Sequence, residues 1–148
     1  MFAWGKVKIL MGGEIQPLEK KHICIIDDDP DILIMYRLRF EQDGYYVSVA
    51  VNGEEGLSLV RSVLPDVIIL DLQMPQMDGI SVLSELNRDP ELAHTPVIIL
   101  SNNNSDQMFQ KITELGTVRY YIVKTLTTPK KVVEIVTEVL MNDSEIEK

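Results

Sequence analysis

The stretch VIILDLQMPQMDG, residues 67–79, decides the fold. Residues 67–70 are a continuous apolar run, which is typical of a strand that is buried on both faces of a parallel sheet. Asp71 follows directly, and residues 74–79 contain the proline and glycine typical of a loop. A short helix is then indicated by apolar side chains at helical spacing, namely Ile80, Leu83 and Leu86. The stretch therefore predicts a strand, a loop and a helix, with a carboxylate where the strand ends.

The same pattern recurs on both sides of this stretch. Upstream, the apolar run Ile23–Ile26 ends at Asp27-Asp28-Asp29-Pro30. Asp29 is a good helix N-cap, and Pro30 suits the first helical position. Downstream, residues 97–100 form another apolar run, which is followed by Ser101. Two more buried strands are therefore predicted, each with polar residues at its carboxyl end.

Five strands and five helices alternate along the chain. The strands are predicted at residues 23–26, 45–50, 67–70, 97–100 and 120–123, and the helices begin near Pro30, Asn52, Ile80, Asp106 and Pro129. Strict alternation predicts an α/β fold with a parallel sheet and right-handed crossovers. The second strand is the least apolar and suits an edge. We therefore expect a flavodoxin-like doubly wound (βα)5 sheet in the order 2-1-3-4-5, in which ligands bind beyond the carboxyl ends of the strands.

The length of 148 residues suits one domain. Residues 1–20 are interpreted as an N-terminal extension of unknown role, because Gly12-Gly13 and Pro17 break regular elements. Within it, Phe2 and Trp4 either dock on the domain or belong to a disordered tail. Residues 21–141 form the predicted domain, and residues 142–148 a polar tail. The eight residues after Leu140 are too few for a DNA-binding unit, so we expect a single-domain protein.

Composition excludes several classes of protein. The net charge of −9, from 14 basic and 23 acidic side chains, argues against direct binding to nucleic acid, which needs a basic face. The apolar runs are too short to span a membrane, and the start lacks the continuous apolar region of a signal peptide. Cys24 is the sole cysteine, so an intramolecular disulfide is impossible and zinc spacing is absent. A cytoplasmic location is the expectation.

The predicted strand ends bring together a set of charged and polar side chains. They are Asp27, Asp28, Asp71, Ser101 and Lys124. Parallel strands end at the same edge of a sheet, and the third strand, which carries Asp71, lies in the middle. Three neighbouring carboxylates repel one another unless a cation lies between them, and oxygen ligands favour Mg²⁺. A metal, a lysine and a hydroxyl around an aspartate fit phosphoryl transfer to that aspartate.

Four segments of the chain resemble the receiver domain of two-component response regulators. They are residues 25–30 (IIDDDP), 68–79 (IILDLQMPQMDG), 96–101 (PVIILS) and 121–124 (YIVK). The resemblance covers roughly residues 20–140. It implies a phosphoacceptor at Asp71 and a Mg²⁺ (or Mn²⁺) ion held by Asp28 directly, by Asp27 largely through water, by Asp71 and by the backbone carbonyl of Gln73.

The resemblance also implies roles on the side of the fourth and fifth strands. Ser101 would hydrogen-bond the phosphoryl group and Lys124 would pair with it. Ser101 and Tyr121 match the switch pair of the family. Gln73 and Asn103 match the two variable positions that tune phosphoryl lifetime.

Three features depart from the family pattern, all on this same side. Thr125 follows Lys124, where the family usually has a proline joined by a cis peptide bond. A cis bond to a residue other than proline costs about 3–4 kcal/mol, so the Lys124–Thr125 bond is predicted to be trans or strained. Asn102 stands where a small residue is usual, so we expect it to narrow access to the phosphosite or to block the aromatic switch. One extra residue lies between Gly116 and Tyr121.

The resemblance implies a non-enzymatic signalling protein that takes a phosphoryl group from a sensor histidine kinase or a phosphotransfer protein. The face made by the helix near 106–115, the strand 120–123 and the helix near 129–140 would meet an unknown target, and it is also the family's usual dimer surface. A phosphorylation-independent docking module is the alternative.

A hydrolase of the haloacid-dehalogenase type would need an acid two residues after Asp71, where Gln73 stands. Nucleotide binding is disfavoured because no glycine-rich phosphate loop occurs.

Overall fold

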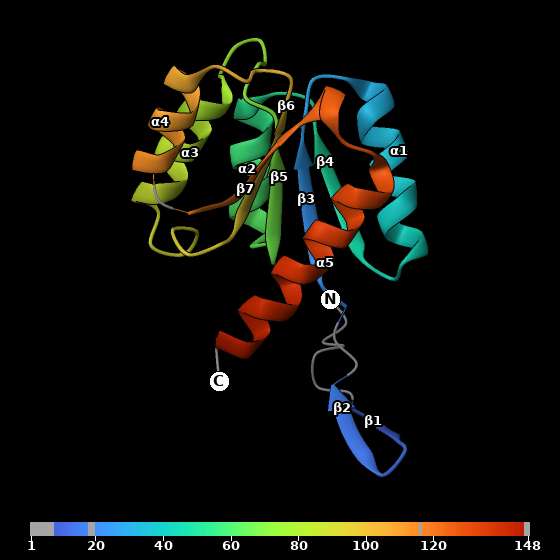
Figure 1. Cartoon of the computed structure of the whole chain (residues 1–148). Coiled ribbons are helices and arrows are strands. Elements are labelled where there is room, and N and C mark those ends of the chain that lie inside the picture. The colour runs from blue at the N-terminus through green and yellow to red at the C-terminus, as the bar shows by residue number, and fades with distance from the viewer. Residues whose placement is uncertain (1–7, 18–19, 116, 147–148) are drawn as a thin grey trace.

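The computed structural model describes residues 8–17, 20–115 and 117–146 (Figure 1). Its main body is a five-stranded parallel sheet in the order β4-β3-β5-β6-β7. The strands are β3 (His22–Ile26), β4 (Tyr46–Ala50), β5 (Val67–Leu70), β6 (Val97–Ser101) and β7 (Val118–Val123). The helices are α1 (Pro30–Gln42), α2 (Gly53–Val63), α3 (Gly79–Arg88), α4 (Asp106–Glu114) and α5 (Pro129–Ile146), with a 3₁₀ turn η2 (Lys124–Leu126). Counting the sheet strands along the chain gives the predicted order 2-1-3-4-5, so the fold prediction is confirmed.

Two apolar layers cover the faces of the sheet. Side chains alternate along a strand, so Ile23 and Ile25 pack with α1 and α5, whereas Cys24 and Ile26 pack with α2, α3 and α4. Figure 1 shows α1 and α5 on one face and α2 and α3 on the other. All four residues of β5 are buried, which explains their uninterrupted apolar character. This central strand carries Asp71 at its carboxyl end.

Local capping fixes where the helices begin. The Asp29 side chain accepts from the N–H of Asp31 at 3.0 Å, and Pro30 occupies the first turn of α1. Asn52 caps α2 by accepting from the N–H of Glu55 at 2.9 Å. The carboxylate of Glu55 lies 3.5 Å from the N–H of Val51, one residue before the expected capping-box position. These caps place both helix starts beside the carboxyl ends of β3 and β4.

The extra residue before Tyr121 is accommodated by a β-bulge. The register pairs Val97 with Val118 but Ile98 with Tyr120, so β7 holds one more residue than β6 at this point. β7 therefore starts at Val118, earlier than predicted, and the bulge restores the pairing of Tyr121 with Ile99 and of Val123 with Ser101. The insertion does not displace the end of β7.

The N-terminal extension contains a β-hairpin, and the expectation that its glycines and proline break regular structure was wrong. β1 (Lys8–Met11) pairs antiparallel with β2 (Glu14–Pro17). Gly12 and Gly13 have φ of 58° and 84°, the left-handed conformation that a two-residue hairpin turn requires and that glycine adopts without strain. Pro17 ends the second strand. Phe2 and Trp4 lie outside the described residues.

The polar tail also differs from expectation, because α5 continues to Ile146, into residues 142–146. No glycine or proline interrupts this segment, and extending an existing helix adds one hydrogen bond for each residue that is ordered.

In the part of the chain that the structure describes, no helix has both the length and the apolar character needed to cross a membrane.

Candidate functional site

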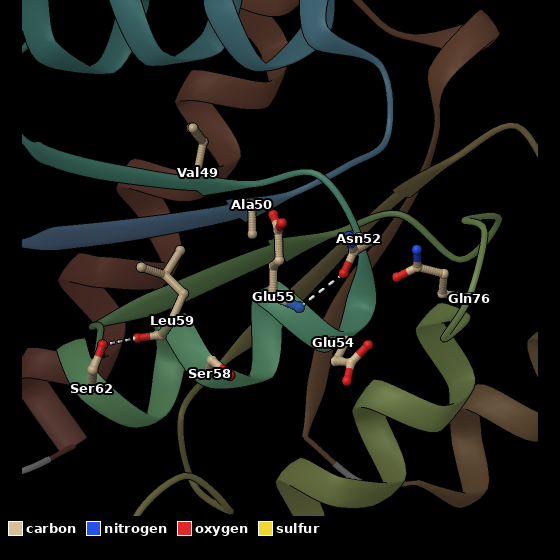
Figure 2. Close-up of a pocket in the computed structure, with 9 residues that line it drawn as sticks. All are labelled: Val49, Ala50, Asn52, Glu54, Glu55, Ser58, Leu59, Ser62 and Gln76. Atoms are coloured by element: carbon tan, nitrogen blue, oxygen red, sulfur yellow. Dashed lines mark hydrogen bonds between the residues drawn. The ribbon is translucent and has the colours of Figure 1, made fainter.

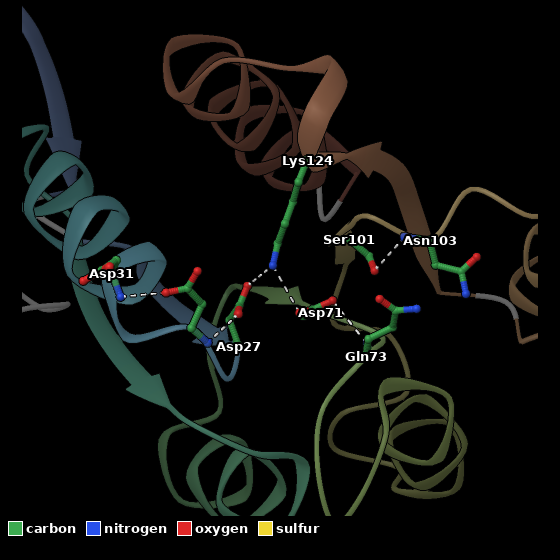
Figure 3. Close-up of polar contacts among 8 residues, drawn as sticks. Asp27, Asp31, Asp71, Gln73, Ser101, Asn103 and Lys124 are labelled. Carbon is green, nitrogen blue, oxygen red and sulfur yellow. Dashed lines mark hydrogen bonds and ion pairs between the residues drawn. The ribbon is translucent and has the colours of Figure 1, made fainter.

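The predicted site residues lie at the carboxyl edge of the sheet (Figure 3). Asp27 directly follows β3, Asp71 follows β5, Ser101 is the last residue of β6, and Lys124 is the first residue after β7. Asp27, Asp71 and Ser101 are at most 5% exposed, whereas Asp28 is exposed. The topology therefore brings these four strand ends together around Asp71.

Lys124 joins the two buried carboxylates. Its Nζ lies 2.7 Å from Oδ2 of Asp27 and 3.1 Å from Oδ2 of Asp71 (Figure 3). Burial alone would lower the pKa of Lys124, but the hydrogen bond to Asp27 and the charges of both carboxylates outweigh it and raise the pKa. The ammonium group is thus held in its charged form between the carboxylates.

Asp27 is a buried carboxylate with fixed partners. Its Oδ1 accepts from the N–H of Asp29 at 2.9 Å, and its Oδ2 faces Lys124. Burial raises the pKa of Asp27, and the charge of Asp71 adds to this, whereas the bonds from Lys124 and Asp29 oppose it. A cation beside Asp27 would lower the cost of its ionisation.

Asp71 is positioned by the loop that follows it. Its Oδ1 accepts from the N–H of Gln73 at 3.2 Å, while Oδ2 faces Lys124. Gly79 holds the far end of this loop, since its N–H donates to the carbonyl of Leu72 at 3.0 Å. A Cβ at Gly79 would lie 2.5 Å from the backbone oxygen of Asp71, so this close approach requires glycine.

The three aspartates suit a hard cation. Asp27, Asp28 and Asp71 each have one carboxylate oxygen that lies within 4.8 Å of the other two. Two are buried and one is exposed, which leaves a side open to solvent. An all-oxygen donor set with remaining positions for water fits Mg²⁺ or Mn²⁺. Sequence reasoning named these same residues.

The predicted switch residues are linked through one intermediate residue. The N–H of Asn103 lies 3.4 Å from Oγ of Ser101, and the hydroxyl of Tyr121 donates to the carbonyl of Asn103. The ring of Tyr121 meets that of Phe109 edge to face, with centroids 4.7 Å apart. Burial raises the pKa of Tyr121, and the charge of Asp71 adds to this. A continuous path therefore runs from the fourth strand end to α4.

Two features on this side were not found by sequence reasoning. Phe109 is partly exposed on α4, and nothing in the sequence identifies it as the partner of Tyr121. The side chain of Asn103 accepts from the N–H of Ser105 at 3.1 Å, so it is tied to the start of α4. Asn102 is exposed, and the peptide bond before Thr125 is trans.

Comparison with known proteins gives one family. The family model for the response regulator receiver domain matches residues 23–137. A curated relative, the DNA-binding dual master transcriptional regulator RpaA of Synechocystis, is 43% identical over 79 residues, which are 53% of this chain and 33% of that protein. An uncharacterised 14.6 kDa protein of Leptolyngbya boryana is 36% identical over 87 residues, covering 59% of this chain and 66% of its own. The chain thus spans about a third of the first relative's length.

Solved structures agree with the sequence relatives. A CheY-like receiver domain protein of Methanospirillum hungatei is 25% identical, with a TM-score of 0.80, and the match covers 88% of this chain and 100% of that one. Chemotaxis protein CheY4 of Vibrio cholerae is 25% identical, with a TM-score of 0.75 over 82% of this chain and 99% of its own. Fold, site and sequence together show that this chain belongs to the response regulator receiver domain family.

Proposed function

We propose that Asp71 accepts a phosphoryl group from a histidine kinase or phosphotransfer protein, with Mg²⁺ or Mn²⁺ held by Asp27, Asp28, Asp71 and the backbone carbonyl of Gln73. The observation that carries this proposal is the set of charged and polar groups around the Asp71 carboxylate. A buried carboxylate lies between the ammonium of Lys124 and a backbone N–H, with two further carboxylates close enough to share a cation. This arrangement favours an anionic group bearing several oxygens above Asp71.

The transfer needs few protein groups. A carboxylate oxygen of Asp71 attacks the phosphorus of the donor phosphohistidine, the P–O bond forms and the P–N bond breaks, and the imidazole leaves with the bonding pair. Lys124 stabilises charge on the phosphoryl oxygens, and the bound metal would supply further positive charge there. Water later cleaves the acyl phosphate and restores Asp71. The domain therefore acts as a signalling module that assists its own phosphorylation and slow dephosphorylation.

The signal would leave the site through Ser101. Its hydroxyl is buried beside the pocket and is already linked through Asn103 to Tyr121. A groove of about 350 Å³ between α4 and β7, lined in part by Phe109, Ile112 and Tyr121, borders this path. Movement of Ser101 toward a phosphoryl group would shift the position of Tyr121 and reshape the groove. We propose this face for the downstream protein.

The donor would dock beside the pocket, on α1. This helix begins just after Asp27–Asp29 and exposes three apolar side chains, with exposed fractions of 59% for Ile34, 37% for Met35 and 56% for Leu38. Leu126, two residues after Lys124, is 79% exposed. Exposed apolar side chains grouped on one element mark a protein contact surface. A helical donor could thus bring its phosphohistidine to Asp71.

Incubation with acetyl phosphate and Mg²⁺ tests the proposal by intact mass. We expect wild type to gain one phosphate, Asp71→Asn to gain none, and the matched variant Asp43→Asn, at an exposed helix end, to behave as wild type. Equal labelling of wild type and Asp71→Asn would contradict the assignment of the acceptor. An absence of labelling in all three would favour a phosphorylation-independent docking module.

A further inference from the structure

The open edge of the sheet at β4 presents unpaired backbone groups. The N–H of Tyr46 donates to Lys21 at 3.0 Å, and the carbonyl of Ala50 accepts from Asp27 at 3.1 Å, so both point toward β3. Backbone groups alternate in direction along a strand, and those of Val47 and Val49 therefore point to the opposite edge. β4 is the last strand of the sheet, and no described strand pairs with that edge. Such an edge is a template for a further strand.

The N-terminal hairpin presents backbone groups that could pair with this edge. A two-residue turn makes Met11 and Glu14 a hydrogen-bonded pair, and the pairs then alternate along the hairpin. On β1 the N–H and carbonyl groups of Lys8 and Leu10 therefore point outward, two residues apart, as do those of Val47 and Val49 on β4. On β2 the corresponding position is Pro17, which has no N–H. β1 is thus the strand suited to extend another sheet.

The space beside β4 is open on the side of α2. A groove of about 560 Å³ runs along the β4 edge, between Val49 and Ala50 and the outer face of α2 (Figure 2). Glu54 and Glu55 line it, and both are exposed. A strand added along β4 would border this groove.

The hairpin does not cover the edge of its own sheet. In Figure 1 it projects beyond the amino ends of the strands, away from the domain. The chain enters the domain beside the start of β4, where the ammonium of Lys20 lies 4.9 Å from the centre of the Tyr46 ring. A two-stranded hairpin is marginally stable alone and gains from joining a larger sheet. The outer edge of β1 and the outer edge of β4 in another copy could therefore pair with each other.

We propose that β1 of one copy adds to the β4 edge of a second copy, and that two copies exchange their hairpins reciprocally. Lys8 would lie opposite Val49 and Leu10 opposite Val47, which allows up to four backbone hydrogen bonds for each hairpin. A reciprocal exchange closes a two-fold dimer and leaves no free hairpin. This interface is distinct from the α4–β7–α5 face and does not involve the Asp71 pocket.

The test measures molar mass by light scattering over a range of protein concentrations. The wild-type mass is expected to rise from 16.8 kDa toward twice that value. The double variant Gly12→Val/Gly13→Val should remain monomeric, because β-branched residues resist positive φ at both turn positions. The matched variant Gly12→Asn keeps an Asn-Gly turn and should dimerise as wild type does.

A second variant tests the edge itself. Val49→Pro removes one outward N–H but leaves the pairing of β4 with β3, so it should abolish dimerisation; a melting curve checks that the variant is folded. A wild type that stays monomeric, or a dimer that survives both the glycine and the proline changes, would overturn the proposal. Hydrogen-exchange protection at Val47 and Val49 in a monomer, lost in the double glycine variant, would mean docking on the same chain and would also overturn it. Acetyl phosphate labelling of Asp71 should be unchanged in every variant, which separates this test from that of the phosphoacceptor.

Discussion

The acid pocket and the Tyr121 side of the same sheet edge are built in different ways. In the pocket, Lys124 after β7 forms direct ion pairs with Asp27 after β3 and with Asp71 after β5. On the other side, Ser101 and Tyr121 are linked by hydrogen bonds to the backbone of Asn103, and Tyr121 contacts the partly exposed Phe109. Charges in a buried pocket are strongly coupled, whereas a loop with an exposed aromatic contact is easily rearranged. From this difference we expect that phosphorylation of Asp71 and its readout through Tyr121 can be changed separately.

The largest effect should come from Lys124→Ala, which breaks the pocket at its centre. Removing a buried group that stabilises charge in a transition state costs about 100-fold or more in rate. We expect the initial rate of Asp71 labelling by acetyl phosphate to fall by about that factor. Lys131→Ala, which removes an exposed lysine of α5, serves as the control. A labelling rate within about twofold of wild type would mean that Lys124 has no role in the transfer.

Metal binding is the next largest expected effect, and it also concerns only the pocket. A ligand that binds the folded state alone stabilises it in proportion to the logarithm of its concentration, by about 2.7 kcal/mol at one hundred times the dissociation constant. Millimolar Mg²⁺ should therefore raise the melting temperature of wild type, and Asp28→Asn should reduce the increase. Asp31→Asn, an exposed acid in the first turn of α1, is the control. A melting temperature that does not change when Mg²⁺ is added would argue against the acid pocket as a metal site.

The Lys124 and Mg²⁺ experiments test only the acid pocket. Tyr121→Phe instead changes the Tyr121 side and should leave the pocket intact. The variant loses the hydroxyl bond to the Asn103 carbonyl but keeps the ring against Phe109. A hydrogen bond contributes about 1 kcal/mol, so the free energy of unfolding should fall by about that amount in denaturant titrations. The rate of labelling at Asp71 should stay within about twofold of wild type. A large loss of labelling would show that the two sides are not separable.

The smallest effect is expected at Cys24, which lies in the interior of β3 and belongs to neither region. The thiol is fully buried, and burial raises its pKa to about 12. Thiolate is the reactive form, so a thiol reagent should modify native protein far more slowly than protein unfolded in denaturant. Rapid modification of the native protein, with or without Mg²⁺, would show that the sheet opens at β3.

The pocket could be predicted from the sequence because it depends on residue type at strand ends. Buried runs such as residues 67–70 identify the strands, and parallel topology then brings their final residues together. The bulge in β7 and the partnership of Tyr121 with Phe109 depend on how surface elements pack, which apolar spacing does not encode. The hairpin is not predicted, because Gly12-Gly13 is equally consistent with a break in regular structure and with a tight turn between two strands.

The identity of the acceptor is the central claim, and chemical mapping tests it most directly. Borohydride reduces an acyl phosphate to an alcohol, so a phosphorylated aspartate becomes homoserine, which peptide mass spectrometry locates. After treatment with acetyl phosphate and Mg²⁺, we predict homoserine at position 71 and at no other acidic residue. Homoserine at position 27 or 28, or its absence from a protein that has gained phosphate mass, would contradict the assignment of Asp71.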